Sequence, residues 1–439
     1  MIRRIQIAML FVMCFFYKHI YAQPNTDSLI AFYSKKMNTY LVKESKVAES
    51  FVLNNDGIQV FAPITDTTDR QYEFTLYWSD VVTFLELNKT MNSRTIYEYY
   101  MNREKNSIKE WTNTNERIVP PSVKKNSLDS LRIAIDPGHI AGDLETAKME
   151  RKFVEMKRGT NGKINDTNVE IIEGKLTLAT AIMLKKKLEK KGAIVMLTRD
   201  KPNISAFGVD YKKWKDSLFL TSLESAYKSG EITFEERHFL KTKASDTEIF
   251  RMFFLQEDMR ERARKINAFK PDLTLIIHYN VDETNSNWSK PSKKNYNMAF
   301  VGGCFGENEL DNPEERIDFL RLLLSNDIET SSEFSYHVLK NLVRTTKVPA
   351  ALNTDALYLQ ENCLNTDYQG IYSRNLVLTR RVKGTICYGE SLYQDNINEC
   401  KELCKENISI EGIITSKRVE EIAKSYYDGI VDYLRNRNK

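Results

Sequence analysis

Two histidines and two glutamates of this chain have the side chains and the local settings expected of a hydrolytic metal centre. They are His139, Glu173, His278 and Glu390. Two imidazoles and one carboxylate are a recurrent ligand set for catalytic zinc, which keeps a fourth position for water. A further carboxylate that does not bind the metal can act as the general base for that water. Together the four residues predict metal-assisted hydrolysis.

Each of the four also has a simpler explanation when it is taken alone. A histidine at a strand end is more often a packed core or rim residue than a ligand. Glu173 alone would stabilise a helix N-terminus through the helix dipole, and Glu390 alone would be a surface acid. The chain has only five histidines, however, and His19 lies in a predicted signal segment. The combination therefore carries more weight than any single member.

The elements that must position these side chains alternate between strand and helix patterns from Leu131 onward, which predicts an α/β sheet. The predicted strands are Leu131–Ile135, Ala193–Leu197, Leu273–Ile277, Ala299–Val301 and Thr385–Tyr388, and the predicted helices are Glu173–Lys191, Asp258–Phe269 and Lys417–Arg435. His139, His278 and Glu390 each end or follow a strand. Open α/β sheets place ligand sites beyond the carboxyl ends of their strands, so we expect one shared pocket.

Residues 1–22 have the features of a secretory signal peptide. Arg3 and Arg4 precede the apolar segment Ile5–Phe16, and Ala22 is a small residue at the expected cleavage point. That segment would rise only about 18 Å as a helix, which is too short to span a bilayer. We therefore expect export, to the periplasm or the cell surface, and no membrane span after cleavage.

Composition and charge exclude several classes of protein. The chain is 41% hydrophobic and 28% charged, which is typical of globular proteins and argues against wholesale disorder or many membrane spans. Removing residues 1–22 changes 64 basic against 60 acidic residues into 61 against 60, so no nucleic-acid partner is expected. Five cysteines then remain, an odd and low number that does not indicate a disulfide scaffold.

The region between the signal peptide and the predicted sheet has a different pattern. Residues 23–119 predict a small α+β module whose role the sequence does not reveal. Pro120 and Pro121 begin a predicted linker over residues 120–130, because consecutive prolines interrupt both helix and sheet. The remainder, residues 131–439, is the predicted catalytic domain.

The order and spacing of the motifs in that domain resemble the zinc-dependent N-acetylmuramoyl-L-alanine amidases of bacterial cell walls. The segment IAIDPGH, residues 133–139, is followed by Glu173 five residues before Leu178, and then by LTRD, residues 197–200. An R-x4-N-x4-D pattern comes next and is followed by H-x-N. The last motif is a glutamate followed by an asparagine at the spacing that the family shows. Those positions are Arg262, Asn267, Asp272, His278, Asn280, Glu390 and Asn396.

This resemblance implies a role for each candidate. His139, Glu173 and His278 would bind Zn²⁺, and Glu390 would be the catalytic base. Glu170 is a rival ligand three residues before Glu173, but the spacing to Leu178 and the helix start favour Glu173. The implied fold is α/β, a mixed, mostly parallel sheet flanked by helices in a phosphorylase/hydrolase-like arrangement, with the small α+β module in front.

The chain departs from the family pattern in three places and is longer in two. Ile140-Ala141-Gly142, Ile276 and Leu392 stand where the family has Gly-Gly, Ser and Gly. Insertions are expected at about residues 140–170 and 200–255. Inserted segments often build pocket walls or lids. Two interpretations of Ala206–Ser245 therefore stay open: a lid that partly covers the site, and a packed surface decoration.

The resemblance implies hydrolysis of the amide bond between N-acetylmuramic acid and L-alanine, with peptidoglycan or a muropeptide as substrate. Two alternatives stay open at this point. One is a zinc carboxypeptidase-like hydrolase of wall peptides, and the other is an inactive peptidoglycan-binding or regulatory protein. A protein activator is also left open by the sequence.

Overall fold

The computed structural model describes residues 26–62, 71–106, 127–156, 168–285 and 289–436. The predicted signal peptide and the first part of the predicted linker, residues 120–126, lie outside these ranges. Among the described residues, no helix combines the length and the apolar character needed to cross a bilayer.

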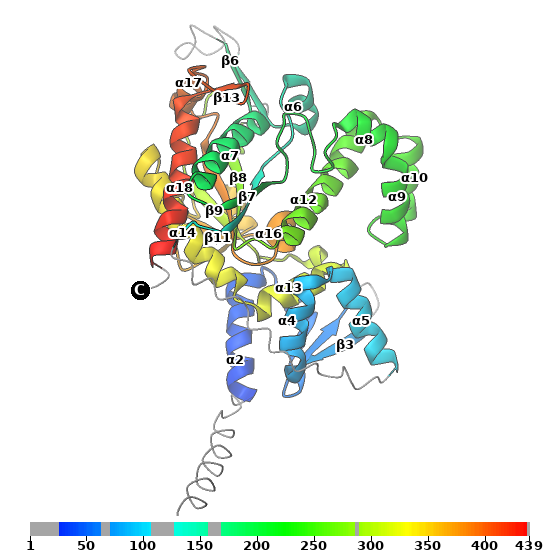
Figure 1. The fold of residues 1–439 in the computed structure, drawn as a ribbon. Helices are drawn as coiled ribbons and strands as arrows, with labels where there is room; N and C mark the ends of the chain where they lie inside the picture. The colour runs from blue at the N-terminus through cyan, green and yellow to red at the C-terminus, as the bar shows by residue number, and fades with distance from the viewer. Residues whose placement is uncertain (1–25, 63–70, 107–126, 157–167, 286–288, 437–439) are drawn as a thin grey trace, which may run out of the picture.

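A seven-stranded mixed sheet forms the centre of the molecule, in the order β10-β11-β9-β12-β8-β4-β7 (Figure 1). Its strands are β4 (Arg132–Pro137), β7 (Ile194–Leu197), β8 (Leu273–Asn280), β9 (Met298–Val301), β10 (Leu364–Asn365), β11 (Ile371–Ser373) and β12 (Ile386–Tyr393). The pairs β4–β7, β4–β8, β8–β12 and β9–β11 are parallel, while β9–β12 and β10–β11 are antiparallel. The expected mixed, mostly parallel sheet is therefore confirmed.

Helices cover both faces of this sheet. Successive side chains of a strand point to opposite faces, and in β4 and β8 both sets are largely apolar and buried. On one face, Ile133 and Leu275 belong to the core beneath the long helices; on the other, Ala134 and Ile276 pack with Ile266. The first face carries α7 (Glu173–Glu189), α14 (Asp327–Thr346) and α18 (Lys417–Asn436), and the second carries α12 (Leu255–Phe269) and α16 (Val377–Arg381). The sheet is thus buried on both sides, as parallel sheets are.

Two strands continue further than the sequence predicted. β8 runs to Asn280 and β12 to Tyr393, so His278 and Glu390 lie within strands and not at their ends. The β12 ladder shifts register between Glu390 and Tyr393, where Leu392 adopts a positive φ of 45°. This bulge lets pairing resume beyond the glutamate, because an extra residue on one strand can be absorbed without ending the ladder.

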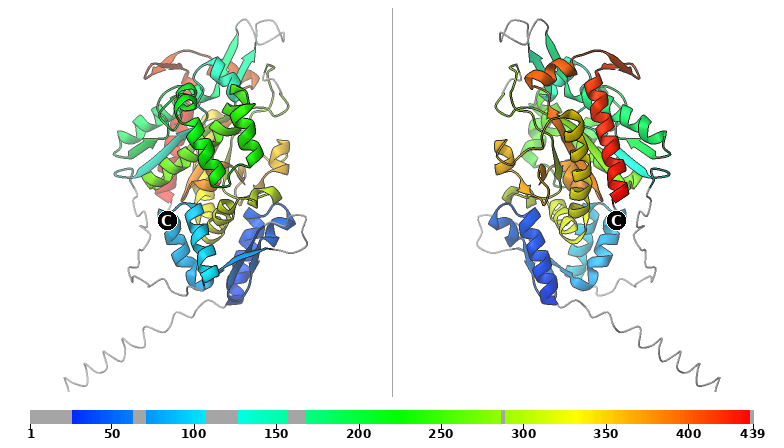
Figure 2. Two further views of the ribbon diagram at one scale, coloured as in Figure 1. Left: turned by 90° about the vertical axis from the view of Figure 1, so that its right-hand side faces the viewer. Right: turned by 90° about the vertical axis from the view of Figure 1, so that its left-hand side faces the viewer.

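The N-terminal region forms its own three-stranded antiparallel sheet with helices. It comprises α2 (Thr26–Lys36), a π-helical turn (Met37–Leu41), α3 (Ser45–Glu49), β1 (Phe51–Leu53), β2 (Gly57–Phe61), β3 (Tyr72–Tyr77), a 3₁₀ turn (Trp78–Asp80), α4 (Val81–Thr90) and α5 (Ser93–Asn106). This confirms a small α+β region, which lies against one end of the larger part in both views of Figure 2. The exact division at residue 119 stays a prediction.

The junction between the two parts is a packed interface around α13 (Pro313–Leu324). The ring of Phe319 stacks on Phe51 with centroids 4.0 Å apart. Arg316 donates two hydrogen bonds to the Glu73 carboxylate, and both side chains are buried. One hydrophobic core runs continuously from the N-terminal region into the sheet, so the N-terminal region is not loosely attached.

Two segments near the candidate site cover the regions where the sequence predicted insertions. The first contains α6 (Leu144–Glu150) and an antiparallel hairpin of β5 (Phe153–Met156) and β6 (Val169–Ile172). The second contains α8 (Tyr211–Ser217), α9 (Phe219–Lys228), α10 (Phe234–Thr242), α11 (Asp246–Ile249) and a π-helical segment (Phe250–Phe254) leading into α12. These helices pack around the buried Trp214 in a core of their own and project beside α12 in Figure 1.

The remaining elements are short. They are a 3₁₀ turn (Glu307–Leu310), α15 (Leu357–Glu361), α17 (Ile397–Leu403) and the hairpin of β13 (Ile408–Ile410) and β14 (Ile413–Thr415).

Candidate active site

Three side chains predicted as ligands converge at the carboxyl edge of the sheet. Glu173 Oε1 lies 3.2 Å from Nε2 of His139 and 3.1 Å from Nδ1 of His278. The two imidazole rings are nearly perpendicular, with centroids 4.8 Å apart. One ligand atom from each residue lies within 4.8 Å of the others, and no other group of this kind occurs in the described part of the chain. Two imidazole nitrogens and a carboxylate oxygen fit the donor set of catalytic zinc.

The strands and one helix explain this convergence. β4 and β8 are paired in parallel up to Pro137 and Ile277, so the residues that follow, His139 and His278, emerge at the same edge. Glu173 is the first residue of α7, which begins at that edge. Gly138 is required between them, because a Cβ there would lie 2.2 Å from the His278 ring.

Two buried arginines hold the backbone of the turn that carries His139. Arg262 donates to the carbonyl oxygens of Pro137 (2.8 Å) and His139 (3.1 Å). Arg199 donates to the carbonyl oxygens of Gly138 (3.0 Å) and Gly174 (2.7 Å), which joins the turn to the start of α7. These contacts stabilise His139 at a φ of 57°, a conformation that residues with side chains rarely adopt.

The other motif residues have structural contacts. Asn267 donates to the Arg381 carbonyl oxygen at 2.9 Å and accepts from the Lys383 amide at 3.0 Å. Asp272 accepts from the Arg132 amide at 2.8 Å. Asn396 caps the N-terminus of α17. These residues fix the ends of elements around the site and do not join the ligand cluster.

Glu150, which the sequence analysis did not identify, lies behind His139. Its carboxylate is 3.0 Å from Nδ1 of His139 and also accepts from the backbone amides of Ile140 and Ala141. Glu150 is buried. A metal-binding histidine commonly donates its second ring N–H to such a carboxylate, which fixes the tautomer and the ring orientation. No motif marks Glu150, which lies in α6 within the first region predicted to be an insertion.

Glu390 lies beside the cluster on β12. It is paired with His278 across the parallel β8–β12 ladder and with Met298 on β9, so the side chains of Glu390 and His278 leave the sheet on the same face. Two residues earlier on the same face, the Tyr388 ring stacks on His278 with centroids 4.6 Å apart and planes 4° apart. Tyr388 thus holds the imidazole from the side of β12.

Burial and neighbouring charges shift the pKa values of Glu173 and Glu390 in opposite directions. Burial, and then the negative charge of Glu173, raise the pKa of Glu390 to about 8. Burial acts to raise the pKa of Glu173 too, but the neighbouring His139 charge outweighs it and holds that pKa well below its usual range. The lowered pKa of Glu173 favours its ionised form, which a metal ligand would need, and the pKa of Glu390 near neutrality is the property that a general base would need.

The pKa values of His139 and His278 are also shifted in opposite directions. Burial acts to lower the pKa of His139, but the carboxylates of Glu173 and Glu150 outweigh it and raise that pKa to about 9. Burial lowers the pKa of His278 to about 4. The rival ligand Glu170 lies on the exposed side of β6 and is not part of the cluster.

A cavity of about 540 Å³ opens onto the cluster. The cavity is lined by His139, Lys152, His278 and Tyr388. Residues of α12, among them Met259, and of α16 form other parts of its wall. No residue of Ala206–Ser245 is among its lining residues. Arg251, in the π-helical segment that follows α11, contacts α6, where its Nε donates to the Met149 carbonyl oxygen at 2.5 Å. The lid over the site stays a prediction, and this cavity gives it no support.

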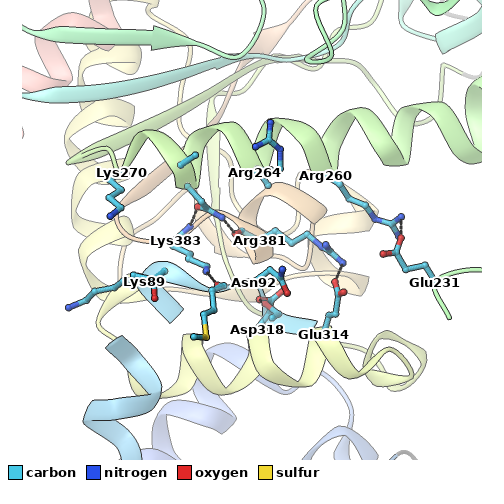
Figure 3. A pocket seen from close by; sticks show the side chains of 16 residues that line it. Lys89, Asn92, Glu231, Arg260, Arg264, Lys270, Glu314, Asp318, Arg381 and Lys383 are labelled. Carbon is cyan, nitrogen blue, oxygen red and sulfur yellow. Dashed lines mark hydrogen bonds and ion pairs between the residues drawn. The ribbon is translucent and has the colours of Figure 1, made fainter. Parts of the chain in front are cut away.

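A second cavity, of about 560 Å³, lies where the N-terminal region meets α12 and α13 (Figure 3). Its charged side chains are largely paired with one another or with the backbone. Arg260 pairs with Glu231, Arg381 pairs with Glu314, and the Lys383 ammonium donates to the carbonyl oxygens of Asn88 and Met91. The cavity and these pairs are part of the junction between the N-terminal region and the larger part of the molecule.

Comparison with known proteins gives one family. The family model for N-acetylmuramoyl-L-alanine amidases matches residues 133–431. Similar solved structures include the CwlD amidase of Clostridioides difficile in complex with the GerS lipoprotein, at 17% identity and a TM-score of 0.37, covering 70% of this chain and 98% of that one. Ami1 of Mycobacterium abscessus has 14% identity and a TM-score of 0.35, covering 70% and 99%. AmiC2 of Nostoc punctiforme has 12% identity and a TM-score of 0.34, covering 70% and 98%. No curated protein matches the chain.

Proposed function

The chain belongs to the N-acetylmuramoyl-L-alanine amidase family, and from this we propose that it is a zinc-dependent enzyme that cleaves the amide bond between N-acetylmuramic acid and L-alanine in peptidoglycan. The observation that carries the proposal is the cluster of His139, Glu173 and His278, whose donor atoms lie within 4.8 Å of one another. Its two imidazole nitrogens and one carboxylate suit zinc better than magnesium or calcium, which prefer all-oxygen sites.

The division of roles follows from burial and charge. A zinc ion bound by these three residues would lower the pKa of water and polarise the scissile carbonyl. Glu390, which lies opposite His278 on the neighbouring strand, would accept the proton of the attacking water. It would then deliver that proton to the nitrogen of the leaving L-alanine, since the group that accepts a proton in one step can donate it in the next.

The surrounding residues would keep the ligands in place during this reaction. Glu150 holds Nδ1 of His139, and Tyr388 stacks against His278. Gln394 Nε2 donates to Oε2 of Glu173 at 3.1 Å, leaving Oε1 directed at the histidines. Each ligand thus has a partner that restricts its rotation, which reduces the reorganisation needed at the moment of reaction.

The proposed place of action is outside the cytoplasm, in the periplasm or at the cell surface, where the wall is accessible. The basic and apolar pattern of residues 1–22 supports this. The mature chain is nearly neutral, so bulk charge would not hold it on an anionic wall, and contacts in the pocket would have to select the substrate.

A digest of purified peptidoglycan, followed by mass spectrometry, tests the proposal. Zinc-loaded protein should release intact peptides with a free L-alanine amino group and leave lactyl carboxylates on the glycan. Treatment with a chelator should abolish release, and adding zinc should restore it. Shortened peptides would indicate a carboxypeptidase instead. Stoichiometric zinc binding without any release would indicate a wall-binding protein without activity.

A further inference from the structure

We infer that Lys152 binds a carboxylate on the peptide part of the substrate, close to the scissile amide. The inference rests on the proposed function and adds a specificity residue to it. The nearest free carboxylate in a muramoyl peptide belongs to the residue after L-alanine, because the alanine carboxyl is itself part of a peptide bond. Lys152 would therefore select peptides with a charged second residue.

The first argument is the position of Lys152 beside a predicted ligand. β5 and β6 are paired antiparallel from Phe153 opposite Ile172 onward. One step further along the ladder, Lys152 lies opposite Glu173, and the Glu173 amide donates to the Lys152 carbonyl oxygen at 3.3 Å. Opposite residues in an antiparallel pair project their side chains to the same face. The Lys152 side chain accordingly lines the cavity with His139 and His278.

The second argument is that Lys152 has no fixed anionic partner in the part of the chain that the structure describes. Of the other cations that line this cavity, Arg262 is paired with Asp258 and Arg380 is paired with Glu315. Within the described ranges, Lys152 forms neither a salt bridge nor a side-chain hydrogen bond. The Lys152 charge acts on Glu390 over a distance: it lowers the pKa of that carboxyl, whereas burial raises it. A half-buried ammonium without a partner is suited to an anion that arrives with the substrate.

The third argument is that the contact would be remote from the bond that breaks. A carboxylate on the second residue keeps its charge throughout the reaction. An ion pair with it is equally strong in the ground state and the transition state, so it lowers KM and leaves kcat unchanged. This separates a binding role for Lys152 from the roles of Glu390 and the ligands.

The test compares two muramoyl peptides that differ only in a carboxylate or a carboxamide on the residue after L-alanine. Binding to zinc-loaded Glu390→Gln protein is measured by calorimetry, so that no hydrolysis occurs. The carboxylate peptide should bind about tenfold more tightly, which corresponds to one typical charge-assisted contact. Adding Lys152→Gln should remove this preference, whereas adding Lys152→Arg should retain it.

Lys148→Gln provides the matched control. Lys148 lies on α6 in the same insertion, but its ammonium is directed to Glu155 at 3.0 Å and does not line the cavity. It should leave both affinities unchanged. In protein with Glu390 intact, Lys152→Gln should raise KM for the carboxylate peptide about tenfold at constant kcat.

Two results would overturn the inference. One is equal binding of both peptides to the protein that retains Lys152. The other is an equal loss for both peptides on Lys152→Gln, which would place the ammonium at the reacting centre or in the fold. Failure of the proposed function is a separate result, because it would appear as the absence of turnover in protein with Glu390 intact while the binding preference is still measured.

Discussion

The Glu150 carboxylate lies 3.0 Å from Nδ1 of His139, while Nε2 of the same ring lies 3.2 Å from Glu173. His139 is therefore held on both sides, by one carboxylate in the ligand cluster and by another behind it. The second carboxylate comes from the segment between His139 and Glu173, in the region predicted to be an insertion.

Glu150→Gln should weaken zinc binding without removing it. The carboxamide keeps the size of the side chain but loses the charge that favours the Nδ1–H tautomer, and changes of this kind typically cost about 10–100-fold in metal affinity. Competition with a fluorescent chelator measures the change. Glu145→Gln, an exposed change on the same helix, is the control. Equal affinities for Glu150→Gln and unaltered protein would show that His139 does not need this carboxylate.

Glu390→Gln should abolish most turnover while the zinc content stays near one per chain. A general base typically contributes about 10²–10⁴-fold to the rate, and Glu390 is not among the predicted ligands. His278→Ala should instead lose the zinc itself. Glu170→Gln, which changes an exposed carboxylate near the site, should alter neither quantity. If the Glu390→Gln variant lost its zinc, the result would show that Glu390 binds the metal and is not only a base.

The raised pKa of Glu390 predicts how pH affects the stability of the metal-free protein. Its pKa is about 8 in the fold against 4.5 ordinarily, chiefly through burial. Between these values the folded protein retains a proton that the unfolded chain releases. The contribution of Glu390 to the free energy of unfolding is therefore largest below pH 4.5 and falls as pH rises toward 8.

Urea unfolding of chelator-treated protein at several pH values measures this effect. The Glu390→Gln variant carries a permanently neutral side chain, so its free energy of unfolding relative to unaltered protein should increase steadily from pH 5 to 8. A difference that stays constant with pH would mean that Glu390 has an ordinary pKa in the fold.

The junction between the N-terminal region and α13 should be essential for stability. Arg316→Met removes a buried cation and leaves the buried Glu73 carboxylate without its bidentate partner. Breaking a buried pair in this way typically costs about 3–5 kcal/mol. Denaturant unfolding measures the cost. Arg344→Met removes an exposed cation and should change stability by less than about 0.5 kcal/mol. Similar values for both variants would mean that the junction contributes little.

The sequence by itself determined the order of the motifs and the type of sheet. Apolar runs and helical periodicity predicted β4, β8 and α7 within a few residues, because these patterns depend on neighbours along the chain. The spacing after each run then indicated which histidines and glutamates would reach one edge. The helices α13 and α14 were not predicted, and in α13 the buried Arg316 and Asp318 interrupt the apolar pattern.

Only the tertiary structure decided what surrounds the predicted ligands. Glu150 reaches His139, and Lys152 reaches the cavity, through the turn at Arg151, whose positive φ of 57° ends α6 and starts β5. The N-terminal region proved to share a core with α13, which no local pattern records. Contacts between segments far apart in the chain depend on how whole elements pack. The sequence therefore predicted which side chains would form the candidate site, and packing decided their supports and the shape of the pocket.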